Sequence, residues 1–454
     1  MIRMEPTITV GIIDRAEAVT GAFRETVSAN GLDFPAGPFQ AVADGENVAL
    51  SGEGSGARIV ARCIRCRISG SAPFVLRDVT IGVAFHWERR REQAFRGDLV
   101  LECRRGLLTA VNEIPLEAYL ESVISSEMSP GAPPEFLKAH AVLSRSWLLA
   151  MLERKAASPV DAAAREETVS IAGPDSAAAE GRTVEIRRWY GREDHEHFDV
   201  CADDHCQRYQ GVGAVTEQAR EAVAATRGRV LTWRGEVCDA RYSKCCGGWT
   251  ERFESAWEDV PVPYLVSVAD GPVSFPVISN EEEATRWIRS EPEACCRVRD
   301  TEVLKSVLPD FDRETPDFFR WKVEYGRDEL QEILKEKSGL DFGDLRGLVP
   351  LERGPSGRIV RLRVEGSRRT AVVGKELEIR RWLSRSHLYS SAFIVETEGP
   401  PSGPPERFIL HGAGWGHGVG LCQIGAAAMA CRRFKAEEIL AHYFPGTSLT
   451  RRYD

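Results

Sequence analysis

The amino-acid sequence predicts an α+β protein with a strand-rich N-terminal part, a core of helices and strands, and a helical insertion. Apolar and polar residues alternate in several runs before residue 110, which is typical of half-buried strands. From Pro115 onward apolar residues recur at helical spacing, in blocks and without sustained alternation of strand and helix. A chain of 454 residues also exceeds the usual length of one domain, so we expect two or three structural units.

The N-terminal part is expected to be built mainly of strands. Alternating runs bounded by Gly and Asp turns predict strands at residues 7–13, 58–68, 79–85 and 98–103. A helix is expected at residues 19–29.

Helices dominate the next part of the chain. The second of them begins after Pro133, which suits a first helical turn. Residues 155–183 are rich in Ala, Ser, Glu and Gly and lack apolar periodicity, so we expect a flexible insertion there. The predicted elements are helices at 116–125, 135–152 and 217–226 and a hairpin at 230–242.

The remainder reads as helices followed by strands. Predicted helices cover 281–290, 299–308, 327–338 and 437–443, and predicted strands cover 359–364, 370–373 and 393–397. The chain is therefore divided into a β-rich part at 1–110, a core at 111–270, a helical then β-rich part at 271–398, and a Gly-rich segment at 399–454 that completes the core.

Charge and cysteine content narrow the functional classes. The formal net charge of -9 argues against non-specific nucleic-acid binding, which needs a basic surface. Neither a signal peptide nor a membrane-spanning segment is visible in the sequence. Twelve cysteines are too dilute for a disulfide scaffold, and both a reduced protein with a metal site and an exported protein without its leader are compatible with them.

The first segment with chemical potential surrounds Glu127. This glutamate stands where an apolar helix is expected to end and a Pro-rich turn begins, in the sequence S-S-E-M-S-P. Its neighbours Val123, Ile124 and Met128 would partly desolvate the carboxyl, which favours proton donation near neutrality. Local composition by itself favours the alternative, an exposed acid near a helix end.

Two later segments are rich in glycine and hydrogen-bonding side chains. Residues 239–251 read D-A-R-Y-S-K-C-C-G-G-W-T-E, a strand that runs into a Gly-Gly turn where backbone can approach a ligand closely. Residues 411–426 read H-G-A-G-W-G-H-G-V-G-L-C-Q-I-G-A, which suits a sugar-binding loop and lacks the spacing of a phosphate loop. A plain Gly-rich turn is the alternative for the second of these.

Together, and in this order, the three segments resemble the sporulation stage II protein D (SpoIID)/LytB family of peptidoglycan proteins. The resemblance extends from about Val79 to the C-terminus and is most specific in the stretch G-W-G-H-G-V-G followed by Gln423. It implies an envelope location and peptidoglycan glycan strands as partner. Sporulation members of the family are lytic transglycosylases that cut strands lacking stem peptides, whereas LytB-like members enhance a partner amidase.

The resemblance also implies roles for individual residues. Glu127 matches the family's catalytic glutamate, which protonates the glycosidic oxygen and then accepts the proton of the muramic acid's 6-hydroxyl, closing a 1,6-anhydro ring. A departure is visible at Cys245, Cys246 and Cys422, where many relatives have small polar residues or Met. The motif positions expected to bind substrate are Arg145, Tyr242, Ser243, Thr250, Glu251, His417 and Gln423. Trp415 of the last Gly-rich loop is also expected to bind substrate, because its flat apolar face suits a sugar ring.

A separate cluster predicts a zinc site. Two imidazoles and two thiolates make a closed tetrahedral set, so we expect structural Zn²⁺. Some sporulation members of the resembled family carry a structural zinc near this point, and His197 could replace the first histidine; buried thiols with solvent-facing histidines are the alternative. The predicted ligands are His195, Cys201, His205 and Cys206.

Two rival functions remain at this point. One is a non-catalytic glycan-binding module that enhances a partner amidase. The other is a zinc hydrolase, which would need an open coordination position at the cluster. We favour the lytic transglycosylase because Glu127 and its surrounding motif are intact.

Overall fold

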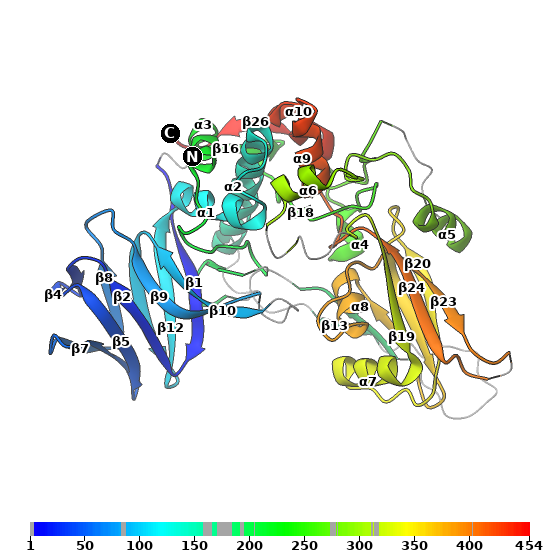
Figure 1. Cartoon of the computed structure of the whole chain (residues 1–454), viewed down its shortest axis with the longest axis horizontal. Coiled ribbons are helices and arrows are strands. Elements are labelled where there is room, and N and C mark those ends of the chain that lie inside the picture. The colour runs from blue at the N-terminus through cyan, green and yellow to red at the C-terminus, as the bar shows by residue number, and fades with distance from the viewer. Residues whose placement is uncertain are drawn as a thin grey trace.

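The computed structural model confirms the predicted α+β class. It describes residues 4–82, 88–157, 166–169, 184–190, 195–203, 205–272, 278, 280–309, 312, 317–401 and 403–454. The N-terminal sheets and the C-terminal sheets flank a central helical region, and the two chain ends lie close together beside that region (Figure 1). Within the described residues, no helix combines the length and apolar character needed to cross a membrane.

Two mainly antiparallel sheets build the N-terminal part. The helix predicted at residues 19–29 is wrong, because this stretch contains the strands Ala18–Phe23 and Val27–Ala29. Every second side chain of Ala18–Phe23 faces the core, and Gly21 lies directly against the Phe39 ring. One sheet has the order β15-β1-β12-β11-β8-β3-β4 and the other β10-β9-β2-β5-β6-β7. Their strands are β1 (Thr7–Ala16), β2 (Ala18–Phe23), β3 (Val27–Ala29), β4 (Leu32–Phe34), β5 (Gly37–Asp44), β6 (Asn47–Gly52), β7 (Arg58–Ala61), β8 (Cys63–Arg67), β9 (Phe74–Ile81), β10 (Arg89–Phe95), β11 (Asp98–Arg104), β12 (Leu107–Pro115) and β15 (Val200–Cys201).

The central region confirms the two helices predicted after Pro115. Helix α2 is the axis of this region and contacts the other four helices. The helix that follows the last Gly-rich segment, α9, has no counterpart among the predicted elements. The helices are α1 (Leu116–Glu127), α2 (Pro134–Ala157), α3 (Glu217–Ala225), α9 (Gln423–Cys431) and α10 (Ala436–Tyr443).

Short strands complete the central region. β16 (Arg229–Trp233) lies between β17 (Glu236–Val237) and β26 (Ser448–Arg451), so the predicted hairpin exists but its second strand ends at Val237. β18 (Tyr242–Ser243) runs parallel to β25 (Leu421–Cys422). This second pairing joins the two glycine-rich segments of the sequence.

Most of the predicted insertion at 155–183 lies outside the described residues. Its start continues α2 to Ala157, and β13 (Glu166–Val169) pairs with β14 (Val184–Arg188). β14 in turn runs parallel to β22 (Thr370–Gly374), which links the insertion to the C-terminal sheets.

The C-terminal part contains a five-stranded sheet, β13-β14-β22-β21-β20, and a three-stranded sheet, β19-β24-β23. The helices predicted near 281, 299 and 327 are confirmed. The strands are β19 (Arg320–Gly326), β20 (Leu345–Arg353), β21 (Ile359–Gly366), β23 (Phe393–Glu398) and β24 (Arg407–Ala413), and the helices are α4 (Phe253–Ala256), α5 (Glu281–Arg289), α6 (Thr301–Val307), α7 (Arg327–Ser338) and α8 (Glu376–Trp382).

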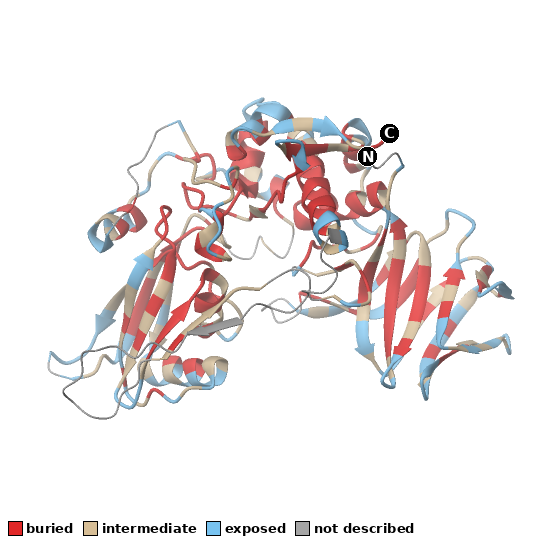
Figure 2. Cartoon of the chain, turned by 180° about the vertical axis from the view of Figure 1, so that it is seen from behind, coloured by how far each residue is buried: buried red, intermediate tan, exposed pale blue. Residues whose placement is uncertain are grey.

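Two large hydrophobic cores correspond to this layout. The larger core is continuous from the N-terminal sheets through α1 and α2 and includes Tyr119 and Trp147. The second lies between the C-terminal strands and their helices and includes Trp321 and Trp382. Figure 2 shows buried residues all along the central helices and on alternating positions of the sheets. The central helices are therefore held on the same core as the N-terminal sheets.

Candidate functional site

Glu127 is the last residue of α1 and is almost fully buried, with 8% of its surface exposed. The helix ends here because Met128 is extended and Ser129 precedes a proline, a position that disfavours helical backbone. Ser129 donates its N–H to the Val307 carbonyl at 2.9 Å, which holds the turn against α6. The carboxyl is thus fixed at a helix end inside the protein.

Two donors converge on one oxygen of this carboxyl. The Tyr242 hydroxyl donates to Oε1 at 2.9 Å, and the backbone N–H of Arg208 donates to the same atom at 3.0 Å. No hydrogen bond to Oε2 is found among the described residues, so the bonds from Tyr242 and Arg208 hold the carboxyl through Oε1.

Lys244 contacts the main chain of Glu127, although it was not among the predicted site residues. Its Nζ donates to the Glu127 main-chain oxygen at 2.9 Å and forms an ion pair with Asp312 Oδ2 at 2.7 Å. The signal that could have identified it is its position two residues after Tyr242, because alternate residues of a strand point to the same side.

A buried histidine packs against the Tyr242 ring. His140 of α2 is fully buried, and its ring lies edge-on to Tyr242 with 4.9 Å between centroids. The side-chain amide of Gln423 lies 3.1 Å from His140 Nε2. Burial lowers the pKa of His140 to about 4, against the opposing charge of Glu127, so the imidazole is neutral near pH 7.

The three motif segments therefore meet at one place. Glu127 of the first contacts Tyr242 of the second, and β18 of the second pairs with β25 of the third. Further main-chain bonds join the second and third segments, from Trp415 N to the Cys245 oxygen at 2.7 Å and from Glu251 N to the Gly418 oxygen at 2.8 Å. Tyr242 and Gln423 are the predicted substrate-binding residues that lie nearest Glu127 through described contacts.

Arg145 does not line a cleft as predicted. Its side chain is fully buried and donates twice to Glu117, at 2.8 and 2.6 Å, and once to the Arg229 carbonyl at 2.9 Å. Burial alone would raise the pKa of Glu117, but the bonds and charge of Arg145 outweigh it and lower that pKa. This pair ties α1 to α2 inside the core.

Thr250 and Glu251 are also internal and not cleft-lining. The Thr250 hydroxyl bonds main-chain groups of the neighbouring loop, including Val268 N at 2.7 Å. Both Glu251 oxygens are occupied, by Ser255 at 2.9 Å and Ser356 at 2.6 Å among others, and burial raises its pKa. Both residues therefore connect loops of the scaffold.

The remaining predicted positions are mixed. Ser243 is buried, and its hydroxyl has no partner among the described residues. The half-buried Trp415 ring stacks on Tyr389, with 4.4 Å between centroids, so this face is occupied by protein. His417 accepts the Val419 N–H at 3.0 Å and packs against Trp257.

The structure brings the four predicted zinc ligands together. The donor atoms of His195, Cys201, His205 and Cys206 all lie within 4.8 Å of one another, whereas His197 is not part of this group. Cys206 Sγ lies 3.3 Å from His195 Nε2 and 3.4 Å from His205 Nδ1. A tetrahedral zinc with ordinary bond lengths would hold sulfur and nitrogen about 3.6 Å apart, so the residues fit the ion. The neighbouring thiol of Cys206 lowers the pKa of Cys201 to about 2, as expected of a thiolate ligand.

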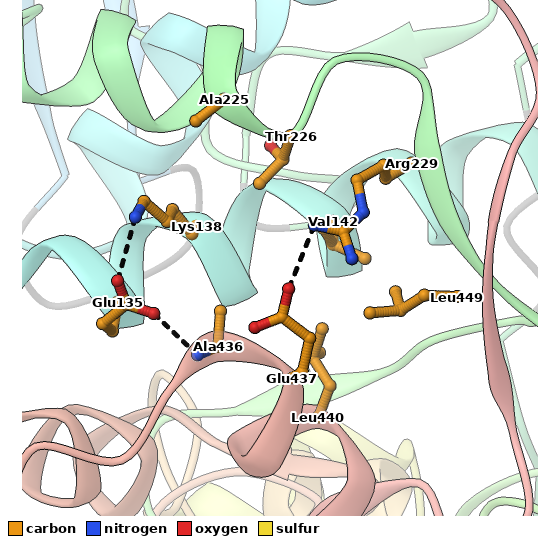
Figure 3. A pocket seen from close by; sticks show the side chains of 10 residues that line it. All are labelled: Glu135, Lys138, Val142, Ala225, Thr226, Arg229, Ala436, Glu437, Leu440 and Leu449. Atoms are coloured by element: carbon orange, nitrogen blue, oxygen red, sulfur yellow. Dashed lines mark hydrogen bonds and ion pairs between the residues drawn. The ribbon is translucent and has the colours of Figure 1, made fainter.

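A small cavity elsewhere is separate from this site. It has a volume of about 120 Å³ and lies between α2, α3 and α10 (Figure 3). Its charged groups pair with one another, as Glu135 with Lys138 at 2.9 Å and Glu437 with Arg229 at 3.0 Å. None of the predicted site residues lines this small cavity, so it is not part of the candidate site around Glu127.

Comparisons with known proteins find two matching families and several relatives. Residues 104–233 match the family described as "Stage II sporulation protein", and residues 251–420 match a "Domain of unknown function (DUF8618)". The chain is 24% identical over 345 residues to stage II sporulation protein D of Bacillus subtilis (strain 168), covering 75% of this chain and 76% of that protein. It is 23% identical to stage II sporulation protein D of Bacillus amyloliquefaciens over the same shares of both chains.

A third relative is named as an amidase enhancer. The chain is 23% identical over 243 residues to the amidase enhancer of Bacillus subtilis (strain 168), covering 51% of this chain and 32% of that protein. The family domain at 104–233 contains Glu127, and the relatives include both branches that the sequence motifs resemble. The chain is therefore similar to stage II sporulation protein D over about three quarters of its length, and its residues 104–233 match the Stage II sporulation protein family.

Proposed function

We propose that this protein cleaves peptidoglycan glycan strands in the cell envelope as a lytic transglycosylase, with Glu127 as its single general acid and base. The observation that carries the proposal is the Glu127 carboxyl, held through one oxygen where the three motif segments meet. Relatives named stage II sporulation protein D support a cell-wall role in sporulation.

The chemistry requires one group that gives and then takes a proton. Protonated Glu127 donates to the glycosidic oxygen as the bond to the muramic acid's C1 breaks, which releases the leaving sugar as an alcohol. The carboxylate then accepts the proton of the 6-hydroxyl while that oxygen bonds to C1, and the acid is regenerated. Because the nucleophile belongs to the substrate, the reaction needs no second carboxylate and consumes no water.

The two oxygens of Glu127 suit this cycle. Oε1 accepts from Tyr242 and Arg208, so the transferable proton resides on Oε2. Both donors stabilise the carboxylate that forms when the proton leaves, which is the charge that develops in the first step. The neutral His140 lies behind Tyr242 and adds no competing proton near pH 7.

Zinc in the predicted cluster would serve this site structurally. Four protein ligands leave no open position for substrate, which disfavours the zinc-hydrolase alternative. Arg208 follows Cys206 by two residues, so an ion that fixes the turn at His205 and Cys206 also fixes the N–H that reaches Glu127. Removing the zinc of this cluster is therefore expected to lower both stability and rate, and Cys201→Ser with Cys206→Ser should lose the ion of this cluster.

The test is cleavage of purified glycan strands that lack stem peptides, with 1,6-anhydro ends detected by mass spectrometry. Glu127→Gln keeps the shape of the side chain but cannot transfer a proton, so the rate should fall at least ~10²-fold. Glu121→Gln is the matched control on the same helix, because Glu121 ion-pairs with Arg96 and Arg220 and does not touch Glu127. This control should cleave at the wild-type rate.

The amidase-enhancer alternative gives a different result. Under that function, wild-type protein would release no anhydro products, yet it would bind glycan and accelerate a partner amidase, and Glu127→Gln would do both equally well. Residual cleavage by Glu127→Gln within a few-fold of wild type would also remove this residue from the mechanism.

A further inference from the structure

A second group of metal-binding side chains lies outside the site described above. It consists of Cys246, Asp270, Cys296 and Cys422, all buried, with donor atoms that lie within 4.8 Å of one another. Cys246 follows β18, and Cys422 is the last residue of β25. The other two come from the chain between Trp249 and α6, so four separate stretches of sequence converge here.

The spacing of the donors suits one tetrahedral ion. Cys246 Sγ and Cys296 Sγ lie 3.7 Å apart, and two sulfurs on a tetrahedral zinc at ordinary bond lengths lie about 3.8 Å apart. A disulfide would require roughly 2.05 Å between these atoms. An iron–sulfur cluster would place several atoms between the cysteine sulfurs and so hold them farther apart than this group allows.

The surroundings of the carboxylate also point to a cation. Asp270 is fully buried, and its described bonds come from the Tyr443 hydroxyl and from Cys296 N at 2.8 Å, neither of which carries charge. The nearby Arg320 guanidinium donates to main-chain carbonyls of Ser290, Gly247, Phe319 and Trp287. The buried thiol of Cys245 also contacts Cys296 and Cys422. A buried carboxylate among these thiols is costly unless a positive charge is paired with it.

One main-chain bond is already directed at a ligand sulfur. Cys246 N donates to Cys422 Sγ at 3.2 Å, which is the kind of bond that supports a metal-bound thiolate. The bonds from the Tyr443 hydroxyl and from Cys296 N likewise orient the Asp270 carboxylate. Hydrogen bonds that would position two of the metal-binding side chains are therefore already in place.

We propose that Cys246, Asp270, Cys296 and Cys422 bind a second zinc ion. Four protein ligands close the coordination sphere, so the ion is structural. It joins β18 to β25 and to the segment around Cys296, and thereby stabilises the strand that carries Tyr242. The proposal does not depend on the proposed reaction, because it concerns metal content.

The test uses the full-length chain purified without chelator. Elemental analysis should give two zinc ions per chain in the wild type and one in Cys201→Ser/Cys206→Ser, whose fold is checked by circular dichroism. Cobalt(II) loaded into that variant should show the absorption of a tetrahedral thiolate site. Cys238→Ala, which alters a buried cysteine outside both groups, is the matched control and should keep both ions.

Asp270→Asn in the Cys201→Ser/Cys206→Ser background should then lower the remaining zinc content. A folded Cys201→Ser/Cys206→Ser protein that holds no zinc and gives no cobalt spectrum would overturn the proposal. Should that variant not fold, wild-type stoichiometry decides, with two zinc ions supporting the second site and one opposing it. A Cys246–Cys296 disulfide found by non-reducing peptide mapping of the native chain would also overturn it.

Discussion

Tyr242→Phe isolates the contribution of a single hydrogen bond to Glu127. The change removes one oxygen atom and leaves the ring against His140, so packing is preserved. A hydrogen bond to a charged group contributes about 1.5–3 kcal/mol. Because the Arg208 N–H still donates to the same Oε1, we expect the lower part of that range, about 1.5–2 kcal/mol, which is roughly a 10- to 30-fold loss of rate.

The assay is initial-rate formation of anhydro ends on strands free of stem peptides. The loss should appear in kcat with little change in KM, because the carboxylate is formed only as the proton leaves. Tyr325→Phe is the control, since that hydroxyl donates to the Leu383 carbonyl at 2.8 Å in the C-terminal part of the chain. A kcat for Tyr242→Phe within twofold of wild type, or a loss as large as that of Glu127→Gln, would refute the reasoning.

Three further changes test the scaffold around the site. Arg145→Met should destabilise the fold by about 3–5 kcal/mol in denaturant unfolding, because it leaves Glu117 charged and buried. Adding Glu117→Gln to this variant should recover part of the loss. A lower rate without destabilisation would instead support the predicted role of Arg145 in substrate binding. Burial lowers the pKa of His140 from 6.5 to about 4, so between these pH values the unfolded chain takes up a proton at this residue and the folded protein does not. The free energy of unfolding should therefore fall by about 3 kcal/mol as the pH is lowered from 6.5 to 4. His140→Gln should flatten this dependence in unfolding measured against pH. Gln423→Ala should lower melting temperature and rate together because its amide contacts His140, and a loss of rate at unchanged melting temperature would place Gln423 at the substrate instead.

Local patterns in the sequence were sufficient for the α+β class and for the central helices α1, α2, α3 and α10, but not for α9. The apolar spacing of α1 and α2 is a property of consecutive residues, and the proline after Ser129 marks where α1 must end. The four predicted zinc ligands lie within a stretch of twelve residues, so their grouping could also be predicted from spacing. The helix predicted at 19–29 failed because pairing with β5 and β9 overrides local preference.

Tertiary structure alone decided which motif residues stand near Glu127. Arg145 and Glu251 share the motifs with Tyr242, but their charges are paired inside the protein, and only contacts with Glu117 and Ser356 reveal this. A motif can be recognised from consecutive residues, whereas the solvent exposure of a side chain depends on the residues that pack around it in the folded protein. Cys246 and Cys422 stand 176 residues apart and meet because two short strands pair in parallel. Such contacts leave no local periodicity, since the residues between them fold into another part of the protein.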